Sequence, residues 1–190
     1  MTAQFGPNGC SALRLASPFA GPPSVCLHAA GQAGPLLGRR VLVTGAGPIG
    51  ALSILVARQA GAREVVATDL AIDMRTDPAG LDRFGADKGT FDVMFEASGS
   101  GEALASALQV ARPNAVVVQL GLSGIMALPV NVLVAKGIQP RGAFRFDAEF
   151  EWAVGFLASG AIDAAPLLTE VVPLHDAVRI FEPAGIAPAP

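Results

Sequence analysis

The stretch Arg39-Arg-Val-Leu-Val-Thr-Gly-Ala-Gly-Pro-Ile-Gly50 decides the fold of this chain. Its first half is a short apolar run with polar flanks, which is typical of a buried strand. Its second half has the pattern Gly45-x-Gly47-x-x-Gly50. Residues 51–60 then form a helix-like run that stops at Gly61, a common residue after the last turn of a helix. A strand, a glycine-rich turn and a helix in this order are the context of a dinucleotide-binding turn.

Each residue of the turn has a physical task in this interpretation. Gly45 permits the sharp bend, Gly47 removes a side chain that would block a pyrophosphate, and Gly50 lets the helix pack close to the sheet. Pro48 costs little near a helix start, where its missing N–H would be unpaired anyway. The helix N-terminus then offers free N–H groups and the positive end of its dipole to the phosphates.

A carboxylate stands at the end of the next predicted strand, residues 64–69. Asp69 follows Gly50 by 19 residues, the spacing at which an acidic side chain accepts hydrogen bonds from the adenosine ribose. Its charge would repel a 2′-phosphate, so we expect NAD as the cofactor rather than NADP. The alternative is a glycine-rich turn in an α/β protein, with Asp69 merely solvated at a strand end.

The rest of the chain alternates short apolar runs with helix-like segments. We predict strands at residues 39–44, 64–69, 91–97, 115–120, 126–130 and 141–146. We predict helices at residues 24–30, 51–60, 77–84, 102–111, 150–158 and 175–182. Residues 1–23 are dense in Gly and Pro and are expected to form a loop. Strands that alternate with helices predict an α/β fold with a parallel sheet covered on both faces.

Composition and charge exclude several classes of protein. Of the 190 residues, 52% are hydrophobic and 15% are charged, which excludes a mainly disordered chain. The formal net charge of −3 gives no basic surface for nucleic acid. The uncharged residues 113–135 are interrupted by Pro, Gly and Asn, so we expect no membrane span. No signal peptide is visible at the N-terminus, so we expect a cytoplasmic location.

Several separate motifs resemble the coenzyme domain of medium-chain, zinc-type dehydrogenases, with the greatest likeness to the polyol branch of sorbitol and L-idonate 5-dehydrogenases. The motifs lie at residues 38–50, 67–70, 91–99, 118–122 and 141–146, and the likeness extends over about residues 24–182. The resemblance implies a Rossmann-type, doubly wound parallel sheet. It also implies an NAD(P)-dependent oxidoreductase. Such an enzyme transfers a hydride between the nicotinamide and a secondary alcohol of a small-molecule polyol or sugar acid.

The same resemblance implies cofactor contacts beyond the glycine turn. Ile49 would pack on the cofactor near the pyrophosphate, and Arg145 would reach the cofactor or a substrate hydroxyl. The positions expected to approach the nicotinamide are Leu120, Gly121, Leu122, Ala143 and Phe144. From the residues alone, the Leu and Phe positions are equally consistent with ordinary core. Arg145 is likewise consistent with an exposed strand arginine that faces opposite to Phe144 and Phe146.

The chain departs from the family pattern at the metal. The family's catalytic domain supplies Cys, His and acidic ligands to a zinc ion that polarises the substrate alcohol. The candidate donors in this chain are Cys10, Cys26, His28 and His175. Cys26 and His28 lie two positions apart on a predicted helix and therefore point to different sides. We expect no zinc site within this chain, and two reduced, buried thiols.

The chain is also shorter than the family pattern. Only 21 residues separate Asp69 from Phe91, where the family places a helix, a strand and another helix. We therefore expect the sheet to lack one edge strand and its helix, and to leave apolar surface uncovered beside the second strand. Residues 184–190, with Pro188 and Pro190, replace the family's returning strand. The expected division is a catalytic-domain remnant and linker at 1–35, an NAD-binding domain at 36–165 and an atypical C-terminal segment at 166–190.

These observations leave three functional hypotheses open. The first is a polyol or sugar-acid dehydrogenase that is catalytically incomplete as this chain. The second is a non-catalytic NAD-binding or interaction module, and the third is a truncated product without stable structure. Residues 124–134 resemble the segment through which family members pair their sheets, which favours a homo-oligomer. The alternative for this segment is a strand that packs against its own sheet.

Overall fold

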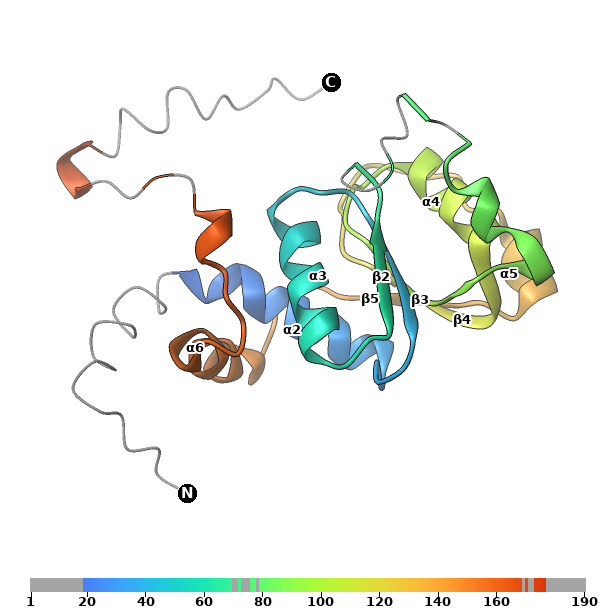
Figure 1. Cartoon of the computed structure of the whole chain (residues 1–190). Coiled ribbons are helices and arrows are strands. Elements are labelled where there is room, and N and C mark those ends of the chain that lie inside the picture. The colour runs from blue at the N-terminus through green and yellow to red at the C-terminus, as the bar shows by residue number, and fades with distance from the viewer. Residues whose placement is uncertain are drawn as a thin grey trace.

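Five short strands run in parallel through the centre of the structure, a computed structural model (Figure 1). The structure describes residues 19–69, 72, 76–77, 79–168, 170 and 173–176. The strands are β1 (Arg40–Thr44), β2 (Glu64–Ala67), β3 (Phe91–Glu96), β4 (Ala111–Gln119) and β5 (Gln139–Gly142), in the spatial order β2-β1-β3-β4-β5. Among the described residues this is the doubly wound order without the edge strand that would lie beside β2. The α/β fold and its shortened sheet are therefore confirmed.

Helices cover both faces of the sheet (Figure 1). The α-helices are α2 (Gly21–Ala33), α3 (Pro48–Gln59), α4 (Gly101–Val110), α5 (Val130–Lys136) and α6 (Glu149–Ser159). The short 3-10 helices are η1 (Asp82–Phe84), η2 (Ala86–Lys88), η3 (Ala165–Leu167) and η4 (Leu174–Asp176). None of the helices in the described part of the chain is long and apolar enough to cross a bilayer.

The alternation of side chains along β1 supplies two separate apolar layers. Leu42 belongs to a buried cluster with residues of α4 and α5, such as Leu108. Val41 and Val43 point the other way, into a cluster with residues of α2 and α3, such as Ala57. A third cluster joins α2, α3 and the residues after α6, through side chains that include Cys26, Leu52 and Ile162. Burial on both faces explains why β1 and β3, in the middle of the sheet, are nearly continuous runs of apolar residues.

The edge of the sheet at β2 is better covered than the sequence suggested. We expected apolar surface to stay exposed there, but Val66 is only 9% exposed. Ile72 and Leu81, from the segment that connects β2 to β3, are buried in the same cluster as Val66. The short connection therefore takes over part of the covering that a full helix and strand would provide.

The structure corrects several of the predicted elements. The loop expected at 1–23 ends earlier, because α2 already begins at Gly21. The helix expected at 77–84 is replaced at its end by the short η1, and η2 follows it, with Asp87 inside η2 at a φ of 51°. The strand expected at 126–130 does not form, because residues 126–129 are neither helix nor strand and α5 begins at Val130. The strand expected at 141–146 lies earlier, as β5, and Arg145 has a φ of 62°, which a strand residue does not adopt. Cys10, residues 177–182 of the last predicted helix and residues 184–190 lie outside the described residues.

Candidate functional site

The glycine turn connects β1 to α3 at the carboxyl end of the sheet. Gly45 has a φ of 89°, in the left-handed region that favours glycine. A Cβ atom at Gly45 would lie 2.9 Å from the backbone N and Cα atoms of Ser98, in the loop after β3. The turn therefore packs directly on a neighbouring loop, and this close approach requires glycine.

The other two glycines of the motif differ from each other in their surroundings. A Cβ at Gly50 would lie 1.9 Å from the carbonyl oxygen of Gly45 and 3.6 Å from the Val43 side chain. Gly50 thus allows close packing mainly of the helix against its own turn, and only secondarily against the sheet. A Cβ at Gly47 would meet no heavy atom within 4 Å, so the space above Gly47 is open. Glycine at this position is not explained by the packing of the protein itself.

The N-terminus of α3 is free to receive an anion. Gly47 is the N-cap and provides no side-chain cap, and the first turn holds no acidic residue. The first hydrogen bond of the helix joins the Ala51 N–H to the Gly47 carbonyl at 2.9 Å. The N–H groups of Ile49 and Gly50 precede this bond, so the helix itself offers them no acceptor. Beside them lies a cavity of about 340 Å³, lined by Phe19, Pro22, Ala46, Gly47, Pro48, Ala51, Leu52 and Leu167.

Asp69 lies two residues beyond Ala67, the last residue of β2 paired with β1, and directly after Thr68, which contacts the turn. The Thr68 N–H donates to the Val43 carbonyl at 3.0 Å, and the Gly45 N–H donates to Thr68 Oγ1 at 3.2 Å. Asp69 itself is exposed. The predicted strand 64–69 is too long, because β2 ends at Ala67 and Asp69 has a φ of 68°. Its N–H donates to the Ile72 carbonyl at 2.7 Å.

The residues expected at the nicotinamide lie in the loops that follow β4 and β5. Leu120 and Gly121 are partly buried, and Leu122 is 78% exposed. Ala143 is buried in the core and donates its N–H to the Gln119 carbonyl at 3.0 Å. These loops come from neighbouring strands and leave the sheet at its carboxyl end.

The expected orientation of Arg145 is wrong. We expected it to face opposite to Phe144, but its guanidinium lies 5.3 Å from the centre of the Phe144 ring. The positive φ of Arg145 ends the alternation of a strand and turns its side chain back over the neighbouring ring. Phe144 is 66% exposed, so it is not ordinary core.

Comparison with known proteins agrees with this geometry. A family model described as zinc-binding dehydrogenase matches residues 70–159. L-Idonate 5-dehydrogenase (NAD(P)(+)) of Escherichia coli is 38% identical over 97% of this chain and 58% of its own length. Its crystal structure superposes with a TM-score of 0.82 and covers 92% of this chain and 55% of that one. Sorbitol dehydrogenase of Macaca fascicularis is 32% identical over 85% of this chain and 50% of its own length.

This chain belongs to the zinc-binding, medium-chain dehydrogenase family. Membership confirms the resemblance inferred from the separate motifs and the expected alcohol and polyol dehydrogenase ancestry. The chain spans about half the length of the curated relatives that it matches.

The described residues do not fit the zinc ion that gives the dehydrogenase family its name. Among them, no three His, Cys, Asp or Glu side chains come together. Cys26 is 1% exposed, and burial raises the pKa of its thiol to about 11 although the Ser53 hydroxyl acts to lower it. His28 faces away from Cys26, as expected, and its Nδ1 lies 3.0 Å from Glu149 Oε1 on α6. The Asp147 N–H and His28 together hold the pKa of Glu149 below its usual range.

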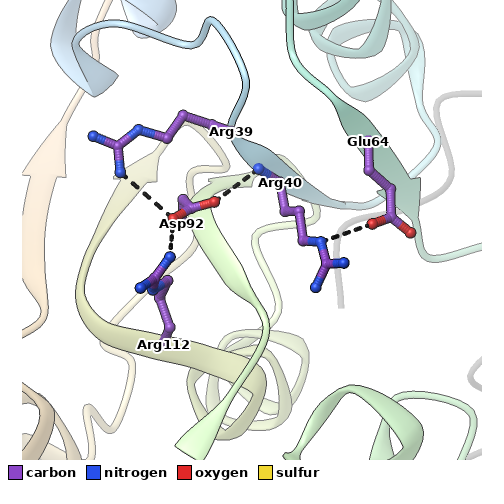
Figure 2. A network of polar contacts seen from close by, with 5 residues as sticks. All are labelled: Arg39, Arg40, Glu64, Asp92 and Arg112. Atoms are coloured by element: carbon purple, nitrogen blue, oxygen red, sulfur yellow. Dashed lines mark hydrogen bonds and ion pairs between the residues drawn. The ribbon is translucent and has the colours of Figure 1, made fainter. Parts of the chain in front are cut away.

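An ionic network surrounds the buried Asp92 at the amino ends of the strands (Figure 2). Asp92, near the start of β3, accepts the Arg40 N–H and the Arg112 guanidinium, each at 2.8 Å. Arg39 approaches the same carboxylate at 3.5 Å, and Arg40 pairs with Glu64 at 3.1 Å. Burial acts to raise the pKa of Asp92, but the hydrogen bonds and positive charges outweigh it and lower the pKa. Because the network holds the amino ends of the strands, its role is structural.

Sequence reasoning missed Glu96, the last residue of β3. Its side chain is completely buried at the carboxyl end of the sheet. A signal was present, since an acidic residue at the end of the apolar run Phe91–Glu96 has to find hydrogen-bond donors when that run is buried.

Proposed function

We propose that this chain binds NAD at the carboxyl end of its sheet, as the coenzyme-binding part of a polyol or sugar-acid dehydrogenase. The observation that carries the proposal is the uncapped N-terminus of α3 beneath the open space at Gly47. That space accepts a pyrophosphate, whose charge the first-turn N–H groups and the helix dipole stabilise. Pro48 starts the helix without an N–H of its own. Ile49, which packs against the cluster of Cys26 and Leu52, would lie beside the pyrophosphate.

Asp69 would hold the adenosine ribose and select NAD over NADP. Its carboxylate is exposed, and Thr68 ties its backbone to the first residue of the turn. A carboxylate at this place accepts hydrogen bonds from ribose hydroxyls and repels a 2′-phosphate. The E. coli relative is named for the use of either NAD or NADP, so the preference for NAD is a property that we propose for this chain.

When bound, the dinucleotide supplies a nicotinamide ring that accepts or returns a hydride. The loops after β4 and β5 line the side of the crevice where this ring would lie. In this proposal Gly121 and Leu122 approach it from one loop, and Ala143, Phe144 and Arg145 from the next. The relatives' names suggest sorbitol or L-idonate as substrate classes. We also propose that the NAD-binding domain spans residues 36–165, between a catalytic-domain remnant and linker at 1–35 and a C-terminal segment at 166–190. The proposed location of the protein is the cytoplasm.

Calorimetric titration of the purified chain with NAD⁺, NADH and NADP⁺ tests the binding. We expect heat with NAD⁺ and NADH and weaker binding of NADP⁺. In Asp69→Ala we expect NAD⁺ affinity to fall about tenfold, which is about 1.4 kcal/mol. The ratio of NAD⁺ affinity to NADP⁺ affinity should fall as well. Asp82→Ala removes another exposed carboxylate, away from the turn, and serves as the control. No heat with any dinucleotide at millimolar concentration would refute the proposal.

A non-catalytic NAD-binding module is the second candidate, because no metal-binding group of side chains forms among the described residues. The two candidates differ in turnover. Formation of NADH from sorbitol or L-idonate, with added zinc, supports the dehydrogenase, whereas NAD⁺ binding without turnover supports the module.

We also propose that residues 124–134 pair with a second copy of the chain. Several large apolar side chains are exposed in and around this segment. They are Ile125, Leu128, Val130 and Val134. Sedimentation equilibrium tests this, with Val134→Glu expected to shift a dimer toward monomer. A monomeric wild-type chain at tens of micromolar would contradict the pairing.

A further inference from the structure

Glu96 is a completely buried carboxylate at the reversal point of the sheet. It pairs with Thr44 across β1 and β3, the two strands from which the chain winds in opposite directions. In open α/β sheets, ligands bind in the crevice outside this point. The carboxylate therefore lies beneath the proposed dinucleotide site.

The Glu96 side chain gathers donors from the ends of three strands. Thr44 Oγ1, at the end of β1, donates to Oε1 at 3.3 Å. In the loop after β3, the Ser98 N–H donates to Oε1 at 2.9 Å, and the Gly99 N–H lies 3.1 and 3.2 Å from the two oxygens. The Ser98 hydroxyl also donates to Oε1. At the end of β4, the Gln119 amide donates to Oε2.

These bonds hold loops that touch one another through their backbones. Gly45 packs on Ser98, as described above, and a Cβ at Gly121 would lie 2.2 Å from the Gly99 nitrogen. The Gln119 amide also donates to the Gly121 carbonyl at 2.8 Å. A shift of the loop after β3 would therefore move the loop after β4 with it.

The hydrogen bonds at residue 96 require both side-chain positions, Oε1 and Oε2, to be acceptors. Oε1 faces the N–H groups of Ser98 and Gly99, and Oε2 faces those of Gly99 and Gln119. An ionised carboxylate accepts all of them, whereas an amide would place its own N–H₂ against N–H donors. Glutamine cannot replace this residue, although it has almost the same size.

We propose that Glu96 is a positioning residue, which sets the loops after β3 and β4 for the nicotinamide half of the dinucleotide. This inference rests on the proposed NAD-binding function. The turn has hydrogen bonds of its own, from Gly45 N–H to Thr68 and from Ala51 N–H to Gly47, which do not involve Glu96. The adenosine and diphosphate part of the ligand should therefore depend less on Glu96 than the nicotinamide half does.

The test compares NAD⁺ with ADP, which lacks the nicotinamide riboside, by calorimetry on the full chain. In Glu96→Gln we expect NAD⁺ affinity to fall more than about tenfold and ADP affinity to change less than about threefold. Glu102→Gln removes an exposed carboxylate on the first turn of α4 and should change neither affinity. A general loss of folding would lower both affinities together. A loss of NAD⁺ affinity without a similar loss of ADP affinity therefore indicates that Glu96 positions the loops at the nicotinamide half.

Gln119→Met provides a second variant, which carries the test if Glu96→Gln does not fold, as judged by the absence of a cooperative unfolding transition. It removes both hydrogen bonds of the Gln119 amide, to Glu96 Oε2 and to the Gly121 carbonyl, and leaves the bonds of Glu96 to Ser98 and Gly99 in place. We expect NAD⁺ affinity to fall about threefold to tenfold with ADP affinity unchanged. Equal losses for the two ligands, or NAD⁺ affinity unchanged in both variants, would overturn the inference. A wild-type chain that binds ADP but not NAD⁺ would also overturn it. If the wild type binds neither ligand, the proposed function itself fails, and the inference fails with it.

Discussion

Replacing Gly47 by alanine should separate cofactor binding from folding. The φ of Gly47 is −63°, which alanine adopts without strain, and a new Cβ would meet no protein atom within 4 Å. The added methyl group would stand in the open space that we assign to the pyrophosphate. The substitution therefore changes the site and leaves the packing of the protein as it is.

The two effects of Gly47→Ala have different sizes. Alanine is a poorer N-cap than glycine, but it also reduces the conformational entropy of the unfolded chain. We expect these to leave the free energy of unfolding within about 1 kcal/mol of wild type. Displacing the pyrophosphate removes at least one charge-assisted hydrogen bond, which is about 1.5–3 kcal/mol. NAD⁺ affinity should therefore fall about ten- to a hundredfold.

Urea unfolding measures the first effect and calorimetric titration with NAD⁺ the second. Gly155→Ala, on α6, makes the same substitution in open space away from the turn and should not affect NAD⁺ binding. Wild-type NAD⁺ affinity in Gly47→Ala would refute the assignment of the pyrophosphate to this turn. A loss of stability well beyond 1 kcal/mol would refute the reading of the space as open.

Three further predictions concern the fold. Gly50→Ala should lower the free energy of unfolding by about 1–3 kcal/mol in urea denaturation, because the new Cβ would lie 1.9 Å from the Gly45 carbonyl oxygen. Asp92→Asn should cost about 1.5–3 kcal/mol at pH 7. Because the folded-state pKa of Asp92 is lowered, its stabilisation is present at neutral pH and is lost as pH falls below about 4. The difference in the free energy of unfolding between wild type and variant, measured in urea, should therefore shrink as the pH is lowered from 7 toward 3, and a constant difference would contradict the assignment. Cys26 should resist iodoacetamide at pH 8 in the native chain and react in urea, as followed by peptide mass spectrometry, since burial raises its pKa to about 11.

Local sequence rules predicted the strands and helices where one pattern dominated. The apolar run of β1, the glycines after it and the helix stop at Gly61 all depend on neighbouring residues, and the structure agrees with them. The rules failed in residues 126–130 and 141–146. Pro129 precedes a short helix there, and a positive φ at Arg145 ends the strand character.

The candidate site divides in the same way. Gly45, Gly47, Gly50 and Asp69 could be identified from spacing, because their roles follow from backbone freedom and charge within one strand-turn-helix unit. Glu96 could not, because its partners come from Thr44, Ser98, Gly99 and Gln119, which are brought together only when three strands pair.

The sequence by itself determined the α/β class of the chain, its glycine turn and the place of Asp69, since these depend on residues close along the chain. Only the tertiary structure decided how the shortened connection after β2 covers the sheet edge and where the buried carboxylate of Glu96 finds its donors. The physical reason is that burial, and the need of a buried charge for hydrogen bonds, are satisfied by whichever segments the parallel pairing brings together.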